Sequence, residues 1–242
     1  MRGISLIYRR EIGQYFASPI AYLIAFAFLL LTALVFNNDL TVSLGEKPAD
    51  PSIIPQFLAF GMVFFAPLLT MRMLAEENRE GTLELLLTAP VREGDIVLGK
   101  FFSAWTYYTI LLLATLLYQR LLPDTASTDL GHLIASYMGI WLYGGATLAV
   151  GLMFSSMTEN QIIAAFLSLS VLLLMYLGDL AGEIVSSVDL ANLIRKMTLQ
   201  GHFSTSFAFG FMRLEDVAFF AGIMTVTLFI TIRIVESHRW RG

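Results

Sequence analysis

Charged side chains gather in one stretch of this otherwise apolar chain, between Met71 and Lys100. Its charged residues include Glu76, Glu77, Arg79, Glu80, Glu84, Arg92, Glu93, Asp95 and Lys100. Carboxylate and guanidinium groups at this density form ion pairs and charge-assisted hydrogen bonds with a partner surface. Because apolar segments long enough to cross a bilayer lie on both sides, we expect a helix-prone loop that meets a partner in water. A loop that is merely solvated is the alternative.

The sequence predicts no catalytic residue and no metal site. The chain has no cysteine, which excludes disulfides, thiolate zinc sites and cysteine nucleophiles. An intramembrane aspartyl protease needs two carboxylates that share a site, and Asp179 has no second acid within an apolar segment. A serine version needs a buried histidine, whereas His132, His202 and His238 all lie outside the apolar segments. No GxxxxGK[ST] motif is present, so the chain cannot itself cradle a nucleotide.

The composition indicates a membrane protein. Of 242 residues, 57% are hydrophobic and 14% are charged, whereas a soluble domain carries about 25% charged residues. Too little polar surface remains to cover a globule in water, so we predict an all-α, polytopic membrane protein. The net charge of −4 gives no reason to expect a nucleic-acid partner.

Six apolar segments are predicted to span the bilayer as one permease-like domain. They are residues 19–36, 54–73, 96–117, 133–157, 161–180 and 217–234. A polar loop with three prolines is expected at residues 37–55. No ionisable residue is expected within the spans, which argues against a transporter driven by protons or sodium.

Two further segments are predicted to lie at the membrane surface. Residues 1–18 read as an interfacial amphipathic helix, with apolar side chains at three- and four-residue steps and arginines between them. Residues 181–215 are predicted to form short helices on the outer face, since Leu190, Leu193 and Met197 follow a helical period. We expect a lid there, formed by phenylalanines that include Phe203, Phe207 and Phe211.

The distribution of arginine and lysine predicts the orientation. Six spans put both termini on one side, and that side also holds the charged loop. The segments on that side carry ten arginines and lysines: Arg2, Arg9, Arg10, Arg72, Arg79, Arg92, Lys100, Arg233, Arg239 and Arg241. The opposite side carries five: Lys47, Arg120, Arg195, Lys196 and Arg213. The termini and the charged loop are therefore predicted to be cytoplasmic.

The charged stretch resembles the first cytoplasmic loop of ABC type-2 exporter permeases, close to the subgroup of gliding-motility-associated permeases. That loop shows acidic residues, then Gly-Thr, Glu-Leu-Leu, a proline, and a Gly-Lys that enters the third span. The residues that carry the resemblance are Glu76, Glu77, Gly81, Thr82, Glu84, Leu85, Leu86, Pro90, Gly99 and Lys100. The amphipathic N-terminal helix, the six spans and the segments before the last span also match, so the resemblance covers the whole chain.

The resemblance implies a transport subunit that is not itself an enzyme. Residues 74–95 would form a coupling loop that docks on a separate cytoplasmic ATP-binding-cassette ATPase subunit. Its expected interface residues are Glu76, Glu77, Arg79, Glu80, Gly81, Thr82, Glu84 and Pro90. Glu80 and Glu84 are expected on the acidic face of one short helix, which Gly81 and Pro90 would bracket or break.

The resemblance also implies cofactors and partners. ATP and Mg²⁺ would be bound by the ATPase, and no cofactor by this chain. A second permease, identical or related, would complete a dimer in a prokaryotic plasma membrane. The remaining alternatives are a non-catalytic membrane scaffold and an ATP-independent channel, with an intramembrane protease much less favoured. An ATPase gene beside this one, and co-purification of its product, would separate these functions.

Overall fold

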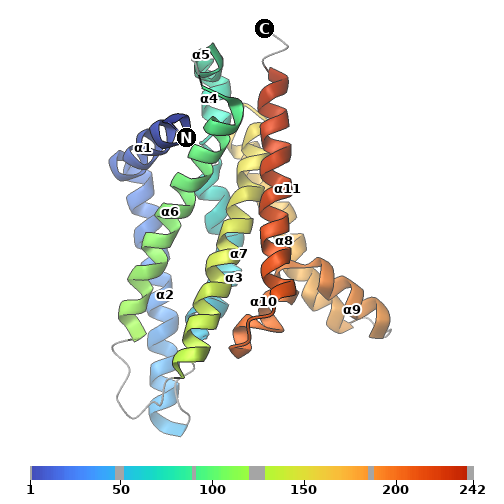
Figure 1. Ribbon diagram of the computed structural model, residues 1–242. Coiled ribbons are helices and arrows are strands. Elements are labelled where there is room, and N and C mark those ends of the chain that lie inside the picture. The colour runs from blue at the N-terminus through green and yellow to red at the C-terminus, as the bar shows by residue number, and fades with distance from the viewer. Residues whose placement is uncertain (1, 47–51, 89–90, 120–128, 185–187, 239–242) are drawn as a thin grey trace.

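The apolar segments of the chain fold into helices in the computed structural model, which describes residues 2–46, 52–88, 91–119, 129–184 and 188–238 (Figure 1). Every regular element within these ranges is helical, as predicted, since a helix satisfies its own backbone hydrogen bonds in hydrocarbon. The elements are α1 (Arg2–Ala17), α2 (Pro19–Glu46), α3 (Ile53–Thr70), α4 (Ala75–Glu80), α5 (Thr82–Thr88), α6 (Glu93–Gln119), α7 (Leu130–Ser156), α8 (Gln161–Ile184), α9 (Val188–Met197), α10 (Leu199–Ser204), the 3-10 helix η1 (Phe207–Phe209) and α11 (Leu214–His238).

In the described ranges, six helices are long and apolar enough to cross a membrane: α2, α3, α6, α7, α8 and α11. Each predicted span falls on one of them. The helices α3, α6 and α7 bury most of their side chains, whereas α2, α8 and α11 bury fewer than a third of theirs. The second group therefore presents the surface that lipid would cover.

The predicted end of the first span is wrong as a helix boundary. We expected a loop from residue 37, but α2 continues to Glu46. No glycine or proline interrupts the chain between Pro19 and Gly45, so nothing breaks the helix where its side chains become polar. The Thr41 hydroxyl donates to the Asn38 carbonyl at 2.8 Å, within the same helix. Hydropathy indicates where a span leaves the hydrocarbon, whereas glycine and proline indicate where a helix ends, so the two boundaries need not coincide.

The helix α7 lies at the centre of the bundle and packs against α3, α6, α8 and α11 (Figure 1). Small residues allow these close approaches. A Cβ atom on Gly144 would meet the ring of Tyr108 on α6 at 2.2 Å, and one on Gly151 would meet Thr70 Oγ1 on α3 at 2.2 Å. The Tyr108 hydroxyl in turn donates to the Ile140 carbonyl at 2.9 Å.

The two ends of the bundle carry different elements. The helices α4 and α5 lie at one end, together with α1 and the end of α11 (Figure 1), and we call this the loop end. The short helices α9 and α10 lie toward the opposite end, where α9 projects sideways from the bundle. Short helices were predicted here, although α8 continues to Ile184, past the expected end at residue 180.

Candidate coupling site at the loop end

Two short helices follow α3, where one was expected. Gly81 ends α4 with φ +70° in the left-handed region, and its amide donates to the Asn78 carbonyl at 3.3 Å. The prediction that Gly81 bounds a helix is therefore confirmed. The prediction that Glu80 and Glu84 share a helix is wrong, because α4 ends at Glu80 and α5 begins at Thr82, with the left-handed Gly81 between them.

The Ser155 side chain fixes the turn that leads from α3 into α4. Its hydroxyl oxygen, at the end of α7, accepts hydrogen bonds from the amides of Leu74 and Ala75, both at 3.1 Å. The same hydroxyl donates to the Met71 carbonyl at 3.0 Å. Ser155 is fully buried, so it satisfies backbone groups that water cannot reach. It acts as an N-cap for α4 supplied by another helix.

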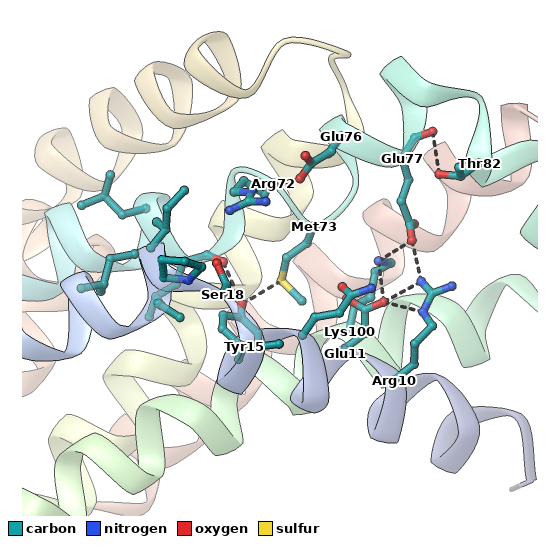
Figure 2. A pocket seen from close by; sticks show the side chains of 18 of the residues that line it. Arg10, Glu11, Tyr15, Ser18, Arg72, Met73, Glu76, Glu77, Thr82 and Lys100 are labelled. Atoms are coloured by element: carbon teal, nitrogen blue, oxygen red, sulfur yellow. Dashed lines mark hydrogen bonds and ion pairs between the residues drawn. The ribbon is translucent and has the colours of Figure 1, made fainter.

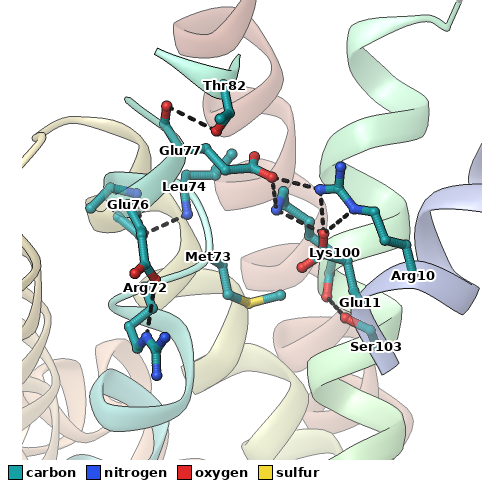
Figure 3. A network of polar contacts seen from close by, with 12 residues as sticks. Arg10, Glu11, Arg72, Met73, Leu74, Glu76, Glu77, Thr82, Lys100 and Ser103 are labelled. Atoms are coloured by element: carbon teal, nitrogen blue, oxygen red, sulfur yellow. Dashed lines mark hydrogen bonds and ion pairs between the residues drawn. The ribbon is translucent and has the colours of Figure 1, made fainter. Parts of the chain in front are cut away.

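Four charged side chains join α1, α4 and α6 (Figure 3). Lys100 Nζ lies 3.1 Å from Glu11 Oε1 and 3.0 Å from Glu77 Oε1. The Arg10 guanidinium lies 2.6 Å from each of the same two oxygens. Lys100 is 1% exposed and Glu11 is 4% exposed. Two cations and two carboxylates thus form a closed, neutral network largely removed from water.

The pKa of Arg10 reflects its place in this network. Burial alone would lower the pKa of Arg10, but its hydrogen bonds and charge interactions with Glu11 and Glu77 outweigh burial and raise that pKa above its usual value. The expectation that no ionisable residue lies within the spans is wrong at Lys100, which falls in the predicted span 96–117 and is buried. Its partners are both carboxylates at the loop end, so it serves to join helices near the membrane surface.

Close packing brings α1 onto the bundle. A Cβ atom on Gly99 would lie 2.8 Å from Ile7 Cβ, so only glycine lets α1 approach α6 this closely. The Tyr15 ring stacks on Tyr107 with centroids 4.8 Å apart, and its hydroxyl donates to the Leu69 carbonyl at 2.8 Å. Burial, followed by the charge of Glu11, raises the pKa of Tyr15, which keeps this donor protonated. Gly99 therefore allows α1 to pack closely against α6, and Lys100 binds α1 through its ion pair with Glu11.

The predicted interface residues divide into inward and outward groups. Glu77 faces the protein's own interior. Glu76 pairs with Arg72 at 3.0 Å, and Arg79 lies 3.8 Å from Glu80. The side chains of Arg79, Glu80 and Glu84 are exposed and that of Thr82 is half-buried. Pro90 lies outside the described residues.

Sequence reasoning missed two residues that hold the loop in place. Glu11 lies on the apolar face of α1, four residues from both Ile7 and Tyr15, and a lone carboxylate in that position indicates a buried partner. Ser155 gave no such signal, because a serine near the end of a span is unremarkable until the backbone beside it is known.

A cavity of about 630 Å³ opens beside this network, between α1, the start of α2, the end of α3, and α4 (Figure 2). Its apolar side is lined by Ile20, Ala21, Ile24, Leu68 and Leu69. Its polar side is lined by Arg10, Glu11, Gln14, Arg72, Glu76, Glu77, Glu80 and Lys100. Apolar and charged side chains therefore line the same cavity.

A second polar cluster lies at the opposite end. His202 on α10 places Nδ1 2.6 Å from Asp216 Oδ1 and Nε2 3.0 Å from the Lys196 carbonyl. Both ring nitrogens of His202 therefore lie within hydrogen-bonding distance of an oxygen atom. Asp179 lies 3.6 Å from Arg195 Nε and accepts a hydrogen bond from Ser204 at 3.3 Å. These contacts join α8, α9, α10 and α11.

The phenylalanines predicted to form a lid differ in their surroundings. Phe203 and Phe207 are fully buried, and each ring lies within about 6 Å of another aromatic ring, Tyr143 or Phe220 respectively. Phe211 is 64% exposed. The first two are core residues of this region, and Phe211 alone presents its ring outward.

The helical bundle defines a polytopic α-helical membrane protein, in which α4 is tied to α1, α6 and α7. In the described part of the chain, no group of three or more histidine, aspartate or glutamate side chains could hold a metal ion. The family model of ABC-2 family transporter proteins matches residues 6–200, and the chain belongs to this family. It is thus a permease component of an ABC transporter, and its family implies an ABC ATPase partner. No curated protein matches the sequence.

Proposed function

We propose that this chain is the membrane subunit of an exporter driven by ATP, and that residues 74–95 couple it to a separate ATPase subunit. The observation that carries the proposal is that ion pairs and hydrogen bonds fix α4 to other helices of the protein. Glu77 ties α4 to α1 and α6, and Ser155 ties its start to α7, while Arg79 and Glu84 remain exposed. A partner that moves the exposed face would move three attached helices with it.

The finer features follow from the resemblance of the loop. We place the permease close to the gliding-motility-associated subgroup, paired with a second identical or related permease and surrounded by lipid. ATP and Mg²⁺ bind on the ATPase and not on this chain. Both termini and the loop face the cytoplasm of a prokaryotic cell. The ten-to-five distribution of arginine and lysine supports this orientation.

The test is association of the purified permease with its ATPase. The double variant Arg79→Glu with Glu84→Lys reverses two exposed charges of the loop without changing the net charge. Exposed pairs contribute about 0–1 kcal/mol each, so the two reversals together should weaken association about tenfold. The matched control is Arg233→Glu with Glu236→Lys on α11, which swaps an exposed pair 2.7 Å apart toward the same end of the bundle.

Equal association for the wild type, the loop variant and the control would refute docking through this loop. A permease that never co-purifies with an ATPase would favour a different function. Conduction of a solute without ATP would indicate a channel, and binding of other proteins without ATP would indicate a scaffold.

A further inference from the structure

The cavity at the loop end has a polarity gradient that suits an amphiphile. Ile20 and Leu68 line its apolar side and are 45% and 42% exposed, so that side opens toward the surface that lipid covers. The charged side lies against α1 and α4, at the loop end (Figure 2). A molecule with an alkyl chain and a polar head would place each part against a matching wall.

The charges of the residues that line the cavity determine which head group of an amphiphile binds there. Arg10, Glu11, Glu77 and Lys100 neutralise one another within their network. The other charged residues that line the cavity are Arg72, Glu76 and Glu80. They leave one carboxylate in excess over the cations that face the cavity.

Arg79 forms only weak ion pairs with Glu76 and Glu80. It lies 4.0 Å from Glu76 and 3.8 Å from Glu80, its side chain is 56% exposed, and it does not line the cavity. Pairs this long and this exposed are screened by water and salt. An ammonium group inside the cavity can therefore approach the carboxylates of Glu76 and Glu80, whereas a head group that carries only negative charge, such as a sulfate, meets an excess of carboxylates.

We propose that this cavity binds an amphiphile with an alkyl chain and an ammonium head group, taken from the leaflet at the loop end. The chain lies along Ile20, Ile24 and Leu68, and the head lies between Glu76 and Glu80. The assignment of this leaflet to the cytoplasmic side of the membrane rests on the proposed function. Two sources share this chemistry: a bilayer aminophospholipid, or an amphiphilic amine that the transporter carries.

The experiment uses the full chain in nanodiscs. Because the sequence has no cysteine, Gln14→Cys gives a single attachment point for an environment-sensitive fluorophore at the cavity wall. The probes are dodecyltrimethylammonium and dodecyl sulfate, which share a chain and differ in head charge. We expect saturable binding of the ammonium probe, about threefold to fivefold tighter than the sulfate probe, as one partly screened charge interaction gives.

Three variants test separately how the head group and the alkyl chain of the probe contribute to binding. Glu76→Gln and Glu80→Gln should each remove the preference for ammonium over sulfate. Ile20→Ser should weaken both probes equally, because it changes only the apolar wall. Glu84→Gln is the matched control, since Glu84 lies on the same loop outside the cavity. Equal affinity for both probes, or a preference that survives both glutamine variants, would overturn the proposal.

Nanodiscs of phosphatidylethanolamine and phosphatidylglycerol identify the source. Affinities are corrected for the binding of the probe to nanodiscs without protein, because the anionic phosphatidylglycerol surface attracts the cationic probe. If the site holds a bilayer lipid, the ammonium probe binds more weakly in phosphatidylethanolamine, which competes for the cavity. If the site takes a transported amine, affinity is equal in both lipids, and the probe stimulates ATP hydrolysis by the assembled complex. Binding is measured without the ATPase, so failure of this site and failure of ATPase docking give separate results.

Discussion

Lys100 Nζ lies 3.0 Å from Glu77 Oε1, which links the third membrane-spanning helix directly to α4. Lys100→Met removes the more buried of the two cations in the network and leaves Glu11 and Glu77 with Arg10 alone. Breaking a buried ion pair costs about 3–5 kcal/mol, so the free energy of unfolding in detergent should fall by about that amount. Lys196→Met, on the exposed face of α9, is the control and should have little effect.

A second substitution tests whether charge imbalance causes that loss. Adding Glu77→Gln to Lys100→Met removes one carboxylate along with one cation, so the double variant should recover part of the stability. If the double variant is as unstable as the sum of the two single variants, the side chains act independently and the network has no cooperative role.

Ser155→Ala should loosen the start of α4 without disturbing α7. The substitution leaves two amides and one carbonyl without their partner, and unsatisfied buried groups cost about 1–3 kcal/mol. We expect faster hydrogen exchange at the amides of Leu74 and Ala75. Ser156→Ala is the matched control, because the Ser156 hydroxyl donates only to the Met153 carbonyl of its own helix, at 2.6 Å. Equal exchange rates in both variants would show that the serine does not cap α4.

The six spans could be predicted from sequence because the bilayer requires long, internally hydrogen-bonded apolar helices. The end of α2 could not, since hydropathy carries no information about a helix that continues into water. Gly81 was predicted to end a helix from its type alone, and its positive φ agrees. Local rules therefore predicted elements, with errors at those boundaries where no breaker occurs.

The partners across the bundle could not be predicted from local rules. Glu77 was expected to face a partner protein together with its neighbours, yet it faces Lys100 and Arg10. Its direction depends on the position of α1, which packs beside α6 through contacts made by residues about 90 positions apart, such as Lys100 with Glu11. Sequence spacing along one helix carries no information about such a contact.

Phe207 and Phe211 should respond differently to the same substitution. Phe207 is fully buried, and a Cβ on the facing Gly139 would lie 2.3 Å from its ring. Removing a buried phenylalanine costs about 3–5 kcal/mol, so Phe207→Ser should lower the unfolding temperature markedly. Phe211→Ser should leave stability within about 0.5 kcal/mol. If Phe211 belongs to a lid, this variant should lower transport while ATPase association stays unchanged, and unchanged transport would remove it from the lid.

Single cysteines should establish the orientation. The wild-type chain has none, so Ser43→Cys near the end of α2 and Thr88→Cys at the end of α5 each give one thiol. The two positions lie at opposite ends of the bundle (Figure 1). We expect a membrane-impermeant maleimide to label position 43 on intact cells and position 88 only after the cells are opened. The reverse result would place the loop outside and contradict the coupling role.

Gly81 tests whether the angle between α4 and α5 transmits movement. A Cβ atom there would meet nothing within 4 Å, so any cost of a side chain comes from the backbone alone. At φ +70° a branched residue costs about 1–2 kcal/mol, enough to change the path of the loop without unfolding six long helices. Gly81→Val should therefore leave membrane insertion intact while ATP hydrolysis by the complex no longer drives transport.

Gly81→Asn is the matched control for that variant, because asparagine adopts the left-handed region more readily than valine does. ATPase association, ATP hydrolysis and substrate movement should be measured side by side on the wild type and both variants. Asparagine should retain most of the coupling and valine should lose it. If both variants transport like the wild type, the left-handed turn is a helix end with no mechanical role, and the coupling proposal would depend on the exposed charges of α4 and α5.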